Sequence, residues 1–117
     1  MIVTAKSSFL KPQIFASIPN LIAAESTRHG GVSQGAYASL NVGISTEDDP
    51  AAVEENRRIF FNSLGLESKQ IASAYQVHGA EILKVETPGR AEGYDALISN
   101  VPHVFLTVTI ADCTPIL

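Results

Sequence analysis

Two side chains in this sequence can bind a metal ion or act as a nucleophile and its base, and each follows an apolar segment. Cys113, the only cysteine, lies in the segment Ala-Asp-Cys-Thr-Pro. His78 lies in the segment Gln-Val-His-Gly, at the end of an earlier run with strand character. Thiolate sulfur and imidazole nitrogen are common zinc ligands, and a thiolate beside an imidazole is also the pair that cysteine hydrolases use. The residues alone leave both chemistries open.

Each of these side chains also has an ordinary structural interpretation. A histidine before a glycine can be hydrogen-bonded in a turn, and free cysteines are mostly buried and inert. A catalytic zinc usually has three protein ligands, so His78 and Cys113 need a third. The chain stops at Leu117, where Pro115-Ile116-Leu117 begins another apolar stretch. We therefore expect the chain to be the N-terminal part of a longer protein.

Composition limits the classes of partner. The chain has 117 residues, 45% of them hydrophobic, which predicts about one small domain over residues 1–117. Eight basic and twelve acidic residues give a net charge of −4 without any Lys/Arg cluster, so nucleic acid is a poor partner. One cysteine excludes an internal disulfide and fits a reducing compartment. No leader-like or membrane-spanning apolar segment is visible, so we expect a soluble cytoplasmic protein without a membrane partner.

The clearest predicted element is a helix from Pro50 to Leu64. Asp49 is a good N-cap, Pro50 suits the first helical position, and Gly65 suits the stop. Strand-like runs, with a turn at Pro88-Gly89 among them, occupy Lys11–Ala16, Ile22–Ser26, Ile71–Val77, Glu81–Glu86, Tyr94–Ser99 and Val104–Ala111. Helix and strands mix without strict alternation, which predicts an α+β fold: a mixed β-sheet packed with helices, as a truncated part of a larger single domain.

Two further features could bind an anion. Arg57 lies on the predicted helix, where its planar fork could pair with a phosphate or carboxylate, although a solvated surface arginine is the commoner case. The Gly30-Gly31 loop could present backbone amides to an anion, although a tight turn is the commoner reason for such a pair. From the residues alone, neither feature is specific.

Six segments are far more specific together than any one of them: Thr27-Arg-His-Gly-Gly-Val-Ser33, Tyr37-Ala-Ser-Leu-Asn41, Asp48-Asp-Pro-Ala-Ala-Val-Glu-Glu-Asn-Arg57, Gln76-Val-His-Gly79, Asp95-Ala96 and Ala111-Asp-Cys-Thr-Pro115. In this order they resemble the multicopper-polyphenol-oxidase or laccase-domain family, also called the YfiH or peptidoglycan editing factor family. The resemblance covers roughly Ser26 to Leu117, which corresponds to about the first half of a typical family member.

The resemblance implies a zinc-dependent purine nucleoside enzyme. Such an enzyme cleaves adenosine, inosine, guanosine and methylthioadenosine with phosphate and also deaminates adenosine. The family's zinc ligands match His78 and Cys113, and a third ligand comes from a downstream His-Ala-Gly-Trp-Arg-Gly motif. This sequence contains no tryptophan and does not reach that motif. The resemblance also implies that Arg57 lines the pocket, holding phosphate in catalysis, and that Asn41 matches a motif of the same cleft.

Copper chemistry, which the family's older name suggests, does not fit the residues. A blue-copper centre takes two histidines and a cysteine, and multicopper oxidases need many further histidines for their other coppers. The chain has three histidines in total. A single zinc therefore fits the ligand inventory better than copper.

Two alternatives to the zinc enzyme remain open at this stage. In the first, Cys113 is the thiolate nucleophile of a cysteine hydrolase and His78 is its base. In the second, the chain is a non-catalytic fragment whose apolar end drives self-association into a homo-oligomer.

Overall fold

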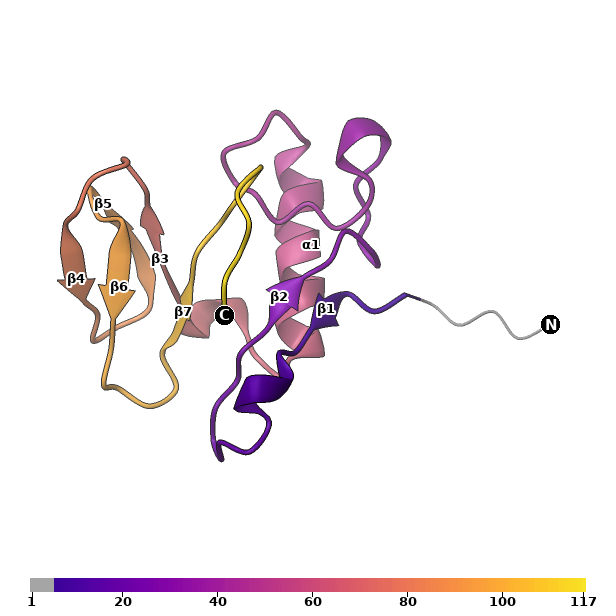
Figure 1. Cartoon of the computed structure of the whole chain (residues 1–117). Helices are drawn as coiled ribbons and strands as arrows, with labels where there is room; N and C mark the ends of the chain where they lie inside the picture. The colour runs from indigo at the N-terminus through magenta and orange to yellow at the C-terminus, as the bar shows by residue number, and fades with distance from the viewer. Residues whose placement is uncertain (1–5) are drawn as a thin grey trace. The chain divides into compact units, whose positions relative to one another are not determined.

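The chain divides into two compact units in the computed structural model, which describes residues 6–117 (Figure 1). The first unit comprises the described residues up to Leu66 together with Cys113–Leu117, and the second comprises Glu67–Asp112. The single domain expected over 1–117 includes residues 1–5, which lie outside the described part, and it stays a prediction. Each unit has its own small core.

The first unit contains the predicted helix, α1, which runs from Pro50 to Ser63. The Asp49 side chain accepts a hydrogen bond from the Ala51 amide at 3.0 Å, and Pro50 occupies the first turn, where its missing N–H costs nothing. At the other end Gly65 has φ +76° and donates to the Asn62 carbonyl, while the next amide donates to the Phe61 carbonyl. This pair of bonds is a Schellman motif. Both helix boundaries are therefore confirmed to within one residue.

Apolar side chains on one side of α1 form the core of the first unit. Phe60 and Phe61 pack with ring centroids 5.4 Å apart, and the other buried apolar residues of this unit are Leu40, Val53 and Leu66. Two very short strands, β1 (Phe9–Leu10) and β2 (Glu25–Ser26), pair antiparallel. Short 3₁₀ turns, η1 (Gln13–Phe15) and η2 (Gly35–Tyr37), occupy part of the remaining chain.

The strand expected at Lys11–Ala16 is wrong, because this segment folds into η1. Pro12 has φ −64° and accepts a hydrogen bond from the Phe15 amide, and the Ala16 amide then bonds back to Gln13. Because the Phe15 and Ala16 amides are used in these local hydrogen bonds, the two amides cannot pair with a neighbouring strand. The strand expected at Ile22–Ser26 is shortened to its last two residues, β2.

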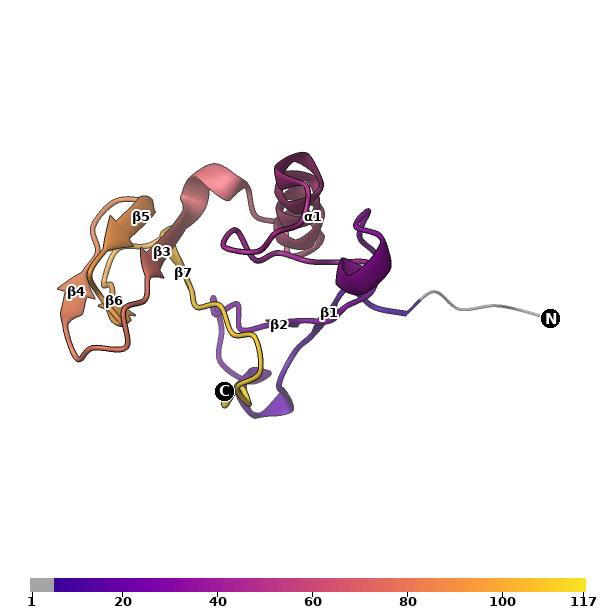
Figure 2. The ribbon, with the colours of Figure 1, turned by 90° about the horizontal axis from the view of Figure 1, so that it is seen from above.

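The second unit is built on parallel strand pairs. Figure 2 shows its strands gathered together. The 3₁₀ turn η3 (Ser68–Gln70) leads into β3 (Ile71–Tyr75), which lies between β5 (Gly89–Glu92) and β7 (Phe105–Thr107). A second pair, β4 (Ile82–Lys84) with β6 (Ala96–Ile98), contacts β3 through β6. Ile71, Ala72 and Val85 are the buried apolar residues of this unit.

β5 is the strand that the sequence did not predict. Gly89, expected in a turn, is its first residue, and Arg90 to Glu92 include no β-branched or aromatic side chain. The strand forms because its backbone pairs with β3 in register from Ala72↔Gly89 to Tyr75↔Glu92. The other four strands expected in this unit are present but shorter than expected.

The α+β class is confirmed, with one α-helix and both strand directions present in the described residues. The antiparallel pair lies in the first unit and the parallel pairs lie in the second. Within residues 6–117 every helix is too short or too polar to span a bilayer.

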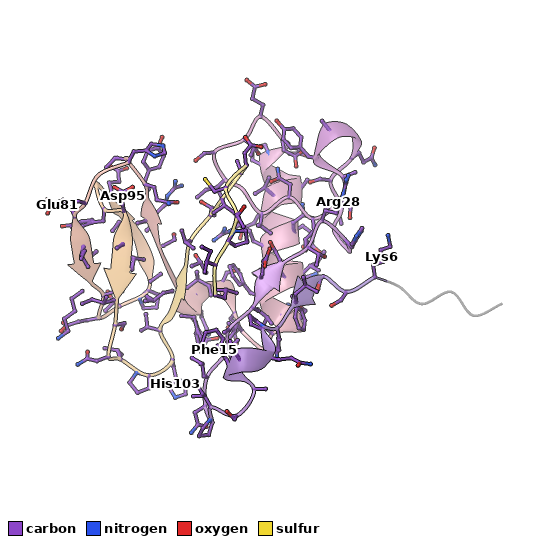
Figure 3. All side chains as sticks on the ribbon, viewed as in Figure 1. Lys6, Phe15, Arg28, Glu81, Asp95 and His103 are labelled. Carbon is purple, nitrogen blue, oxygen red and sulfur yellow. The ribbon has the colours of Figure 1, made fainter. Side chains whose placement is uncertain are left out.

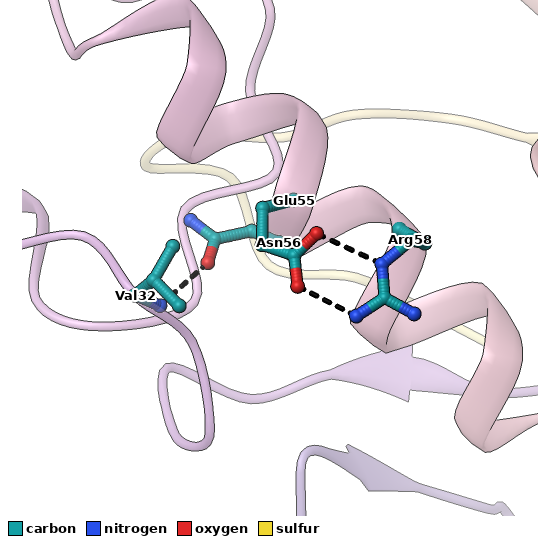
Figure 4. Close-up of polar contacts among 4 residues, drawn as sticks. All are labelled: Val32, Glu55, Asn56 and Arg58. Atoms are coloured by element: carbon teal, nitrogen blue, oxygen red, sulfur yellow. Dashed lines mark hydrogen bonds and ion pairs between the residues drawn. The ribbon is translucent and has the colours of Figure 1, made fainter.

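One side chain, Asn56 on α1, organises the loops of the first unit. It has no exposed surface, although it lies in a run of charged residues. Its Oδ1 accepts from the Val32 amide at 2.7 Å (Figure 4), and its Nδ2 donates to Ser33 Oγ at 2.8 Å and to the Asn41 carbonyl at 2.9 Å. The amide group therefore ties two loop segments to the helix.

The close approach of the loop backbone to Asn56 requires a glycine at position 31. A Cβ at this position would clash with the Ser39 carbonyl oxygen and would lie 2.5 Å from Asn56 Oδ1. The glycine therefore allows the loop backbone to approach the buried amide closely.

Replacing Asn56 by alanine should lower the free energy of unfolding by about 3 kcal/mol, because a buried amide and carbonyl lose their hydrogen-bond partners. Urea unfolding followed by circular dichroism measures this. Arg58→Ala is the matched control: it removes an exposed ion pair to Glu55 on the same helix (Figure 4) and should have a much smaller effect. Equal losses for the two variants would contradict the role of Asn56.

Candidate functional site

Asn41 holds the turn that precedes α1. Its Nδ2 donates to Thr46 Oγ1 at 3.0 Å and to Asp48 Oδ2 at 3.1 Å, and its Oδ1 accepts from the Gly43 amide at 3.0 Å. Both amide hydrogens are thus engaged within the chain. A primary amide has two donors and two acceptor lone pairs, so a substrate contact by Asn41 would use the second lone pair of Oδ1. Its substrate-binding role stays a prediction.

Arg57 is half-buried and lies against the same turn. Its Nη1 donates to the Val42 carbonyl at 3.2 Å, and its guanidinium lies 5.2 Å from the centroid of the Phe61 ring. A cation over an aromatic face is attracted by the negative face of the ring. Two predicted site residues, Asn41 and Arg57, are therefore brought to one turn, and Arg57 is not the solvated surface arginine that is the commoner case.

Asp48 is a polar residue of this turn that sequence reasoning missed. Its Oδ2 accepts from Ser33 Oγ at 2.5 Å and from Asn41, and its Oδ1 accepts from the Asp49 amide at 2.9 Å. The Ser33 hydroxyl above all holds the pKa of the Asp48 carboxyl below its usual value of 3.8, because hydrogen bonds to the charged form favour that form. In the sequence Asp48 looks like one more helix-capping aspartate beside Asp49.

The backbone amides of residues 31–33, in the Gly30-Gly31 loop, donate hydrogen bonds to other groups of the first unit. Gly31 N–H donates to Ser39 Oγ at 3.2 Å, and the Val32 and Ser33 amides donate to Asn56 Oδ1 and to the Ser39 carbonyl. An anion at this loop would have to displace these bonds. The structure therefore does not favour the loop as the anion site considered from the sequence.

His78 lies in the second unit, in the loop that follows β3. It has φ +58°, the left-handed conformation that is uncommon for a residue with a side chain, and it is exposed. Among the described residues its imidazole makes no hydrogen bond. The ring is therefore available to bind a ligand.

The loop of His78 is held by Asp95, which precedes β6. Asp95 Oδ1 accepts from the Val77 and His78 amides at 3.0 and 2.9 Å, and Oδ2 accepts from the Gly79 amide at 2.8 Å. A Cβ at Gly79 would lie 3.3 Å from Oδ2, which is tight. Sequence reasoning noticed Asp95 only as part of a family segment and gave it no role.

Cys113 lies in the first unit and is an exposed, free thiol. His78 belongs to the second unit, and the zinc-ligand role expected for the two residues stays a prediction. Among residues 6–117, no group of three His, Cys, Asp or Glu side chains is arranged to hold a metal ion. His103 is an exposed turn residue with φ +65°, at the end of the second unit opposite to Asp95 and Glu81 (Figure 3).

A family model described as multi-copper polyphenol oxidoreductase laccase matches residues 22–117. The chain belongs to this family. The segments that carry the resemblance, from the Gly30-Gly31 loop to Cys113, all lie inside the matched range, so the family prediction is confirmed.

Curated relatives in the family are named purine nucleoside phosphorylases. The chain is 44% identical to the enzyme of Deinococcus radiodurans over 101 residues, which is 85% of this chain and 39% of that protein. It is 44% identical to YfiH of Escherichia coli over 96 residues, which is 81% of this chain and 39% of that protein. The chain thus spans about two-fifths of the length of these relatives.

Solved structures are similar to the chain over a comparable range. The crystal structure of YlmD from Geobacillus stearothermophilus matches with a TM-score of 0.76 and 30% identity, covering 89% of this chain and 42% of YlmD. The structure of a Bacillus licheniformis protein named YfiH matches with a TM-score of 0.63 and 27% identity, covering 71% of this chain and 35% of that one.

Acid should destabilise the first unit through Asp48. Because its folded-state pKa lies below 3.8, its stabilising effect is present above that pH and is lost as the pH falls through the folded pKa. Urea midpoints measured from neutral pH to below 3.8 should therefore fall for the wild type. Ser33→Ala, which removes the main cause of the shift, should flatten this decline; an unchanged pH profile in Ser33→Ala would contradict the assignment.

Proposed function

We propose that the chain is part of a zinc-dependent purine nucleoside phosphorylase that also deaminates adenosine. The observation that carries this proposal is the identity of 44% to the Deinococcus radiodurans purine nucleoside phosphorylase across 85% of the chain. The proposed substrates are phosphate and the purine nucleosides adenosine, inosine, guanosine and methylthioadenosine. A cytoplasmic location is also proposed, since the single cysteine fits a reducing compartment.

The two donor groups fit zinc in type. Cys113 offers an exposed free thiol, and His78 offers an exposed imidazole whose nitrogens are not used within the described residues. Sulfur and nitrogen ligands are those of catalytic zinc sites, which usually have three protein ligands. The resemblance implies that the third ligand is the histidine of the downstream His-Ala-Gly-Trp-Arg-Gly motif, which this sequence does not reach. When bound, the metal supplies Lewis acidity at the reacting purine.

The phosphate is assigned to Arg57. In phosphorolysis a phosphate oxygen forms a bond to C1′ of the ribosyl group while the bond from C1′ to the purine nitrogen breaks. The base leaves with the bonding electron pair and takes up a proton. Arginine suits the incoming phosphate because its planar fork matches two phosphate oxygens. The Val42 carbonyl and the Phe61 ring hold this fork in place.

Asn41 supports this assignment from the same turn. Because its side chain fixes the Gly43 amide and the Asp48 carboxylate, it also fixes the adjacent Val42 carbonyl to which Arg57 donates. The lone pair that remains on Oδ1 can accept a hydrogen bond from a ribose hydroxyl. Asn41 thus has a positioning role that the structure supports and a substrate contact that is proposed.

The cysteine-hydrolase alternative gains no support from the comparisons, because the relatives are named for phosphorolysis. The same holds for a non-catalytic fragment, and self-association through the apolar end of the chain stays a prediction.

Arg57→Lys should raise the KM for phosphate about 10-fold to 100-fold, because the loss of a charged bidentate contact weakens phosphate binding. Release of hypoxanthine from inosine by the enzyme of which this chain is proposed to be part, followed at increasing phosphate concentration, measures this. Arg58→Ala, the neighbouring arginine that pairs with Glu55, is the matched control and should leave KM unchanged. Phosphate-independent or absent base release from all four nucleosides would contradict the proposed function.

A further inference from the structure

The carboxylate of Asp95 binds three consecutive backbone amides, those of Val77, His78 and Gly79, at 2.8 to 3.0 Å. Successive amides that point to one side form a concave anion site, and a carboxylate bound there makes charge-assisted hydrogen bonds. All of these groups belong to the second unit. The loop after β3 therefore binds the side chain of a residue that lies 16 to 18 positions later in the sequence.

Asp95 is itself fixed in the fold. Its amide donates to the Glu81 carbonyl at 3.1 Å, and the next residue, Ala96, begins the pairing of β6 with β4 at Ile82. Figure 3 shows Asp95 and Glu81 at the same end of the second unit. The loop of His78 is thereby tied to the β4–β6 pair as well as to β3.

The position of the carboxylate differs from the usual support of a metal-binding histidine. Such a histidine commonly donates its second ring N–H to a carboxylate, which fixes the orientation of the ring. Here the carboxylate holds the backbone on both sides of His78, and the ring makes no hydrogen bond within the described residues. The backbone at His78 is left-handed, with φ +58°, which a side chain normally disfavours.

We propose that Asp95 is the positioning residue for His78: by holding the three amides, it keeps the imidazole where it can bind zinc. This inference rests on the proposed function only for the identity of the metal. The claim that Asp95 fixes the backbone at His78 does not depend on that function and concerns residues of the second unit alone.

Asp95→Asn is the sharpest test, because the amide has almost the same shape as the carboxylate. It retains one acceptor oxygen and places an NH₂ group toward backbone N–H donors, so at least one of the three hydrogen bonds is lost. Zinc affinity, measured by competition with a chromophoric chelator, should fall about 10-fold to 100-fold, as for the loss of other residues that support metal ligands.

A second readout does not require zinc. In metal-free protein, nuclear magnetic resonance should show faster hydrogen exchange and shifted signals for the amides of Val77, His78 and Gly79 in Asp95→Asn. Asp95→Glu keeps both carboxylate oxygens on a longer side chain, and its zinc affinity should lie between those of the wild type and Asp95→Asn. This variant keeps the proposal testable if Asp95→Asn does not fold.

Ser99→Ala is the matched control. The Ser99 hydroxyl donates to the Val85 carbonyl at 2.7 Å and accepts from the Val101 amide, so its loss also weakens the region of β6 but leaves the His78 loop intact. Its zinc affinity and the exchange of the three loop amides should match those of the wild type. A loss of zinc affinity equal to that of Asp95→Asn would mean that general destabilisation explains both variants, which overturns the proposal.

These experiments test the positioning role of Asp95 separately from the proposed function. Unchanged loop amides in Asp95→Asn, or changed amides with wild-type zinc affinity, overturn the positioning role of Asp95. If the wild-type enzyme, with the third ligand present, binds no zinc, the proposed function is overturned, while the exchange of the three amides still decides whether Asp95 fixes the His78 backbone.

Discussion

Backbone amides outside helices and strands must find hydrogen-bond partners, and much of this chain depends on how a few polar side chains supply them. The strands are two to five residues long, so ladders satisfy only a small part of the backbone. In the first unit Asn56 accepts from the loop at Val32, and in the second Asp95 accepts from three loop amides. Leaving such groups unsatisfied costs more than the bonds contribute when formed.

The same need for hydrogen-bond partners determines how two proposed functional side chains, Arg57 and His78, are held. Asn56 holds the Asn41 carbonyl, Asn41 holds the turn, and the turn offers Val42 to the guanidinium of Arg57. In the second unit Asp95 fixes the backbone of His78 and leaves its ring exposed. Arg57 and His78 thus each depend on a polar neighbour that holds them in place, which is how rigid sites are commonly built on loops.

Sequence patterns predicted the parts whose signals are local. The helix followed from Asp49, Pro50 and Gly65, since a cap, an N-terminal proline and a C-terminal glycine each act within one turn. β5 did not follow, because its residues lack strand propensity and the pairing with β3 is tertiary.

The candidate site likewise contains residues that the sequence identified and residues that it did not. His78, Cys113, Arg57 and Asn41 were recognised by the segments in which they occur, and the family is confirmed. The roles of Asn56 and Asp95 were not visible, because most of their partners are backbone N–H and C=O groups, which have no residue-type signature in a sequence. Asn56 even resembles a solvated residue, since it lies between Glu55 and Arg57, yet it is fully buried.

The central claim, that His78 and Cys113 serve a zinc enzyme, is tested most directly by the metal content of the purified enzyme of which this chain is proposed to be part, so that the third ligand is present. Plasma mass spectrometry on tag-free protein never exposed to a metal column gives the ratio of each metal to protein. The account predicts near-stoichiometric zinc, which Cys113→Ala abolishes. Negligible zinc in the wild type, or zinc that persists unchanged in Cys113→Ala, would contradict it.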